Sequence, residues 1–147
     1  MDFQLLLTGA VAGISAGAIM IFLSHIAPRL GAGNYIRDID NPQLFGRGIS
    51  RRESHLLGVL VHLCLSILFG IGYAALVDNN LVTGFSFWPI VLYSLAVSLF
   101  VGIFVMPVEG HGFFGMKHDR WFMIDILLTN VFWGLLYFGL VRLWMVA

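Results

Sequence analysis

The chain has 147 residues, of which 59% are hydrophobic and 11% are charged. Soluble proteins carry roughly a quarter of charged residues, so a water-soluble fold is not expected. Eight basic and eight acidic residues cancel, so the chain lacks the basic field that nucleic-acid binding requires.

Four segments are apolar enough to cross a lipid bilayer, which takes about 20 residues in a helix. They cover residues 5–26, 55–77, 88–108 and 121–145. The sequence therefore predicts an all-α fold, an integral membrane antiparallel four-helix transmembrane bundle that forms one domain over residues 1–147. The first segment lacks the positive flank of a secretory signal, so we expect it to be retained as a helix.

The first span carries Gly9, Gly13 and Gly17 at intervals of four residues. Helix association in lipid depends on close packing, and small residues at this spacing allow it. We expect this glycine stripe to pack the first helix against its own bundle, or to contact another copy or another subunit.

Positive charges predict the orientation of the chain, because basic loops near span ends are retained in the cytoplasm. The loop of residues 27–54 contains Arg29, Arg37, Arg47, Arg51 and Arg52. Lys117 and Arg120 lie in the loop of residues 109–120, and the loop between the second and third spans has no basic residue. Both larger loops are therefore expected inside and both termini outside, in the cytoplasmic (inner) membrane of a prokaryote.

The second span contains His62 and the single cysteine, Cys64, which excludes an internal disulfide. His62 lies about two turns into the helix and shares a face with His55, seven residues earlier. An axial imidazole of this kind makes His62 a candidate ligand of haem or of a pigment. A bundle haem usually takes its second ligand from a facing helix, and no other span has a histidine at that depth.

The fourth span contains Asp125, about one turn from its start. Ionisable residues inside spans are costly and are therefore functional candidates. A contact between His62 and Asp125 is predicted, either as a polar clamp that holds the bundle or as the proton path of an oligomeric transporter. Gly70-x-x-Tyr73 and Gly134-x-x-Tyr137 share one spacing, which suggests two helix pairs that arose by duplication.

A metal site is predicted at the inner end of the bundle, where several imidazole and carboxylate groups approach from different spans. Such ligands suit Zn, Cu, Fe or Mn. The candidate ligands are His111, His118, Glu109, Asp125 and His55, with His25 reaching the same end. No HExxH or similar motif connects them, and histidines also suit a membrane interface.

Several short patterns resemble those of small four-span bacterial membrane proteins of uncharacterised function. The patterns are Gly9-Ala-Val-Ala-Gly13, Leu-x-His62, Gly-x-Gly-Tyr73, Val-Met106-Pro107 and Asn130-x-x-x-Gly134. This resemblance implies the architecture and no activity. Asn130 departs from the family pattern, which often has a histidine there, and this departure weakens a paired-histidine site.

The sequence therefore favours a non-catalytic accessory subunit of a larger membrane complex, such as an electron-transfer or oxidase complex. Its expected partners are the lipid bilayer and larger membrane subunits or further copies of the chain. The chain has no GxSxG or P-loop motif, so an enzyme is the weaker expectation. The alternatives are a metal- or haem-binding membrane protein and an oligomeric proton or ion transporter.

Overall fold

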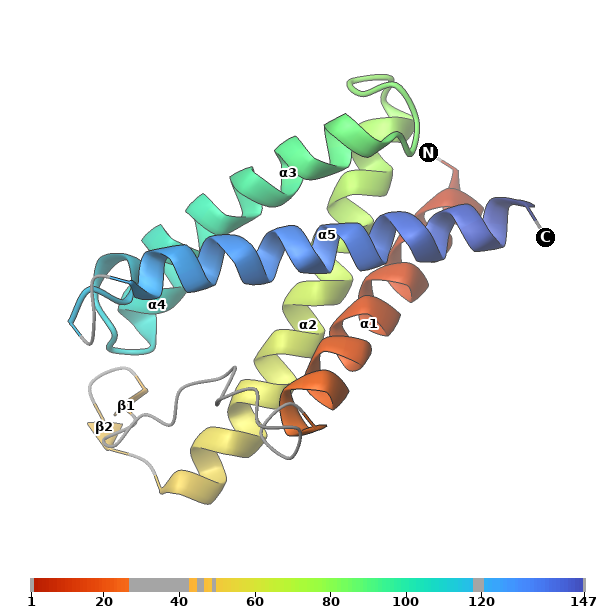
Figure 1. The fold of residues 1–147 in the computed structure, drawn as a ribbon. Coiled ribbons are helices and arrows are strands. Elements are labelled where there is room, and N and C mark those ends of the chain that lie inside the picture. Colours follow the sequence, from red (N-terminus) through yellow and green to blue (C-terminus); the bar gives the residue numbers. More distant parts are fainter. Residues whose placement is uncertain (1, 27–42, 45–46, 49, 118–120, 147) are drawn as a thin grey trace.

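A computed structural model describes residues 2–26, 43–44, 47–48, 50–117 and 121–146. The described residues are almost wholly helical (Figure 1). Its main helices are α1 (Phe3–Ile26), α2 (Arg51–Asp78), α3 (Phe87–Phe100) and α5 (Phe122–Val146). The shorter elements are strands β1 (Gln43–Leu44) and β2 (Arg47–Gly48), the π-helix η2 (Val101–Val105), helix α4 (Met106–Val108) and the 3-10 helix η3 (Phe113–Gly115).

Four helices are long and apolar enough to cross a membrane, as the sequence predicted. These segments are Phe3–Ile26, His55–Asp78, Phe87–Val108 and Phe122–Trp144. Within the loop of residues 27–54, β1 and β2 form a two-residue antiparallel pair, with Gln43 opposite Gly48 and Leu44 opposite Arg47.

Helix α2 begins at Arg51, four residues before the predicted span, because a polar cap extends it. The Ser50 hydroxyl accepts a hydrogen bond from the Glu53 N–H (3.2 Å), and the Ser50 N–H donates to the Glu53 carboxylate (2.9 Å). This reciprocal capping box gives a partner to two backbone N–H groups that the start of a helix otherwise leaves without one. The charged first turn therefore belongs to the helix and leads into its apolar part.

The third span continues as a helix to Val108, as the sequence predicted, but it widens to a π turn near its end. Pro107 has no N–H to donate, and its ring clashes with the carbonyl four residues earlier in a regular α-helix. In the structure the wider π turn of η2 precedes Pro107, and the Met106 N–H bonds to the Val101 carbonyl. The helix thus widens by one residue before α4 and the turn that follows.

The helices pack as two pairs, α1 with α2 and α3 with α5, and α5 also contacts α1. Figure 1 shows α5 crossing α2 and the N and C termini lying near one another. Backbone contact joins α1 to α2 along the glycine stripe. A Cβ added at Gly9 would lie 2.6 Å from the Gly70 carbonyl oxygen, and one at Gly17 would lie 2.5 Å from the Ser66 hydroxyl. The stripe therefore packs inside the bundle.

Two fully buried tyrosines, Tyr73 of α2 and Tyr137 of α5, lie in the core of the bundle with their ring centroids 6.0 Å apart. Tyr137 donates its hydroxyl to the Gly70 carbonyl (3.0 Å), which connects α5 to α2. The repeated Gly-x-x-Tyr step has the same role in both pairs: Gly70 packs on Gly9 of α1, and Gly134 packs on Ser94 of α3. Each glycine allows the two helices of its own pair to pack closely, and each tyrosine is buried in the core that the two pairs share.

Candidate functional site

The turn of residues 109–117 connects α4 to α5 through an unusual backbone. Positive φ angles occur at Gly110 (85°), Gly112 (72°), Phe114 (51°) and Gly115 (70°). Glycine adopts this region readily, whereas a phenylalanine there costs on the order of 1–3 kcal/mol and must be held by its surroundings.

Packing of two aromatic rings holds this turn in place. The Phe114 ring lies so close to Gly102 in the π-helix that a Cβ at Gly102 would overlap it. The Phe122 ring from α5 covers Gly115 in the same way. The turn is therefore a rigid structure, and strained conformations of this kind are often found at functional sites.

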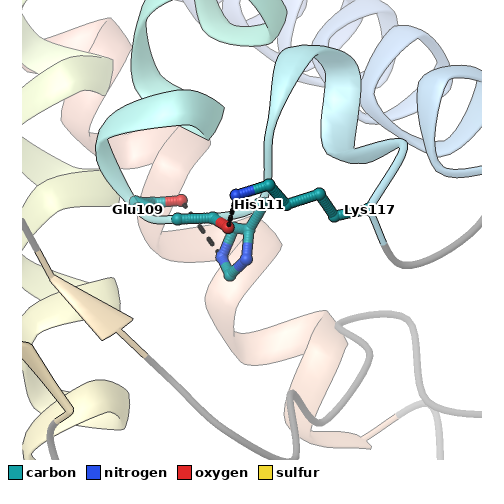
Figure 2. A network of polar contacts seen from close by, with 4 residues as sticks. Glu109, His111 and Lys117 are labelled. Atoms are coloured by element: carbon teal, nitrogen blue, oxygen red, sulfur yellow. Dashed lines mark hydrogen bonds and ion pairs between the residues drawn. The ribbon is translucent and has the colours of Figure 1, made fainter. Parts of the chain in front are cut away.

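Figure 2 shows the polar groups that this turn brings together, Glu109, His111 and Lys117. The His111 side chain is buried, and its Nε2 atom lies 3.8 Å from Glu109 Oε2. The backbone N–H of His111 donates to the Met106 carbonyl (2.9 Å). Lys117 Nζ donates to the Gly110 carbonyl (3.4 Å). The Glu109–His111 separation exceeds a direct hydrogen bond, so it is an electrostatic contact.

The environment of Glu109 changes its proton affinity. Burial raises the pKa of the Glu109 carboxyl above its usual value, because the charged form loses hydration. A carboxyl with a raised pKa close to a buried imidazole is an arrangement that exchanges protons or binds a cation.

The other predicted metal ligands lie elsewhere. His55 is exposed on α2 and contacts His25 at the end of α1, with ring centroids 5.3 Å apart. Asp125 is exposed in the first turn of α5, and His118 lies outside the described residues. Within the part of the chain that the structure describes, no three His, Cys, Asp or Glu side chains gather closely enough to hold a metal ion. The structure therefore brings Glu109 and His111 together, and leaves His55 and Asp125 apart from them.

His62 lies between α2 and α1. A Cβ at Gly17 would lie 3.6 Å from its Cδ2 atom, and its Nε2 atom is buried with no hydrogen-bond partner among the described residues. The predicted contact with Asp125 is not made by this atom. Helix α5 meets α2 about two turns farther along, where Phe69 contacts Trp133 and Gly70 accepts from Tyr137. The two helices cross there and diverge toward their N-terminal ends (Figure 1).

Polar side chains within the spans bond to backbone carbonyls of the bundle. Tyr93 donates to Phe69 (2.9 Å) and Asn130 donates to Ile126 (2.8 Å). Ser94 and Ser98 donate to the carbonyls four residues earlier, at 2.8 and 2.9 Å.

The sequence predicted that Glu109 and His111 cluster close to Lys117, but it did not indicate Phe114 and the π-helix as parts of the site. The only available signal was the run of glycines at positions 110, 112 and 115, which indicates a tight turn without giving its shape. Comparison with protein-family models, with curated protein sequences and with solved structures gave no match.

Proposed function

We propose that this protein is a non-catalytic membrane subunit that crosses the cytoplasmic membrane of a prokaryote four times and packs against larger membrane proteins. One observation carries the proposal: Tyr93, Ser94 and Tyr137 of the spans donate to carbonyls inside the bundle, while its outer faces carry mainly large apolar side chains. Large exposed side chains on these faces include Leu60, Leu68, Leu92 and Leu128. Such a surface is stable only against lipid or against another apolar protein surface.

An antiparallel arrangement with both termini outside agrees with the contacts at the helix ends. The Asp2 N–H donates to the Asp78 carboxylate (3.0 Å), so the start of α1 lies beside the end of α2. His25 and His55 meet at the other end of the same two helices. With the basic loops inside, the 109–117 turn faces the cytoplasm.

Purification from the native membrane tests this function. The tagged chain is extracted in mild detergent, and the intact complex is analysed by native mass spectrometry and for bound metals. We expect one larger membrane protein in fixed stoichiometry. Recovery of the chain alone, or only as copies of itself, contradicts the proposal.

A scan of the outer faces identifies the contact surface. Tryptophan replaces Leu60, Leu68, Leu92 or Leu128 one at a time. The partner should be lost from variants on one face and retained by those on the others, because lipid accommodates a larger apolar side chain and a packed interface does not. Equal retention by all four variants argues against these faces as the docking surface.

The second candidate is a metal-binding membrane protein, and the 3.8 Å approach of Glu109 to His111 favours it. Carboxylate and imidazole together suit Zn, Cu, Fe or Mn. This candidate predicts that His111→Ala loses a bound metal and keeps any partner protein. Haem ligation by His62 gains no support, because its Nε2 atom is buried in the contact between α1 and α2. Transport through His62 and Asp125 gains none either, because these residues lie on diverging helices.

A further inference from the structure

We infer a binding site for one transition-metal ion between His25 and His55, where the end of α1 meets the start of α2. The ring centroids lie 5.3 Å apart and the ring planes are inclined by 75°. Both side chains are exposed, so a dissolved ion can reach them. This site is separate from the Glu109–His111 pair and does not depend on the proposed partner.

His25 already has the tautomer that a metal ligand needs. Its Nδ1 atom lies 2.7 Å from the Ile21 carbonyl oxygen. A carbonyl oxygen only accepts, so Nδ1 carries the proton and the lone pair of a neutral ring is on Nε2. Metal-binding histidines almost always donate their other ring N–H in this way, which fixes the ring and raises the basicity of the ligating nitrogen.

The separation of the two rings matches a shared ion. Zinc–nitrogen bonds of about 2.0–2.1 Å place the centroids of two imidazoles on one tetrahedral ion roughly 5 Å apart. The observed 5.3 Å is close to this value. A nitrogen of His55 would be the second ligand, and water would fill the remaining positions. Imidazole ligands of this kind suit Cu²⁺, Zn²⁺ and Ni²⁺.

An ion at this site would connect α1 to α2 at the end opposite the Asp2–Asp78 hydrogen bond. Binding to the folded state alone raises its stability by an amount that grows with the logarithm of the free ion concentration once that concentration exceeds the Kd. The site also loses its ion on acidification, because only neutral imidazole binds metal.

The test uses the full chain in detergent, purified without a polyhistidine tag. Cu²⁺ is added at one equivalent, and electron paramagnetic resonance counts the nitrogen ligands of the bound ion. Affinities for Zn²⁺ are measured by calorimetry. The expected spectrum shows two imidazole nitrogens, and His25→Gln or His55→Gln each weakens Zn²⁺ binding about tenfold or more. Leu56→Gln changes the residue next to His55 without removing an imidazole, so it is the matched control and leaves this affinity unchanged.

Two results overturn the inference. One is wild-type affinity in both His25→Gln and His55→Gln. The other is loss of binding in His111→Gln with retention in those two variants, which would assign the metal to the Glu109–His111 pair. The nitrogen count needs no substitution, so it decides the question even if a variant fails to fold: fewer than two imidazoles on the bound Cu²⁺ also overturns the inference.

Discussion

Glycines in these helices differ mainly in what lies next to them. A Cβ added at Gly13 would overlap the Ser66 carbonyl oxygen and lie 3.2 Å from Gly70 Cα, so backbone atoms occupy the space. Gly58 and Gly139 also lie in helices, but nothing comes within 4 Å of a Cβ added there. The same residue type therefore permits a helix contact in one place and only weakens the helix in another.

Gly13→Ala should destabilise the bundle by about 1–3 kcal/mol, because α1 and α2 must separate to admit the methyl group. Gly58→Ala is the matched control and should stabilise the helix by roughly 0.5–1 kcal/mol. Unfolding in mixed detergent micelles, followed by circular dichroism, measures both changes. Equal stability of Gly13→Ala and the wild type would contradict the close contact between α1 and α2.

Glu109 gives the molecule a dependence on pH with a defined sign. Burial raises the pKa of its carboxyl above the 4.5 of an unperturbed glutamate, so the folded state binds the proton more tightly than the unfolded state. The free energy of unfolding is therefore greatest below the unfolded pKa and falls as the pH rises through the folded pKa. Glu109→Gln should remove this fall and raise the melting temperature at neutral pH. Parallel melting-temperature profiles for the two proteins would show that Glu109 is not the cause.

At the scale of elements, the sequence predicted the spans well because each is a long apolar run with polar residues at its ends. The π turn before Pro107 was not predicted, because a proline in the sequence does not indicate whether the helix ends there or continues with a wider turn. The 109–117 turn depends on Phe114 reaching Gly102 and Phe122 reaching Gly115. Such contacts follow from the path of the chain, and no spacing in the sequence encodes them.

Two six-residue segments of the chain are partly alike in sequence. Pro-x-x-Gly-x-Gly occurs at residues 28–33 and again at 107–112. Leu30 and Ala32 occupy the places that Glu109 and His111 take in the second copy. The spacing is thus compatible with apolar side chains at both places, so the acidic and imidazole groups are additions to it. Residues 28–33 lie outside the described part of the structure.

Ser50→Ala should destabilise the start of α2 by about 0.5–2 kcal/mol, because the capping box with Glu53 is lost. Ser86→Ala provides the control: Ser86 is the N-cap of α3 but makes no side-chain cap hydrogen bond. Hydrogen exchange of the amides in the first turn of each helix measures the difference. A larger increase in exchange rate at α3 on Ser86→Ala than at α2 on Ser50→Ala would contradict this expectation.

At the scale of the whole molecule, the sequence predicted which segments form long apolar helices more easily than how these helices cross. His62 and Asp125 were expected to meet because both lie near one end of their spans. Depth along a helix follows from counting residues, whereas the crossing of α2 and α5 near Gly70 and Tyr137 follows from side-chain packing. The glycine stripe was easier to interpret, because small residues at intervals of four have few other uses in a span.

The central claim is that the exposed apolar faces of the helices lie inside a membrane. The single Cys64 tests it without any substitution, since it is exposed on α2 within the span His55–Asp78. Sealed native membranes are treated with a membrane-impermeant maleimide, before and after denaturation in sodium dodecyl sulfate. We expect no labelling of Cys64 in the folded protein, whether the membranes are sealed or opened, and complete labelling after denaturation. Rapid labelling of Cys64 in the folded protein would show that this face of α2 is in contact with water, which contradicts its place inside the membrane.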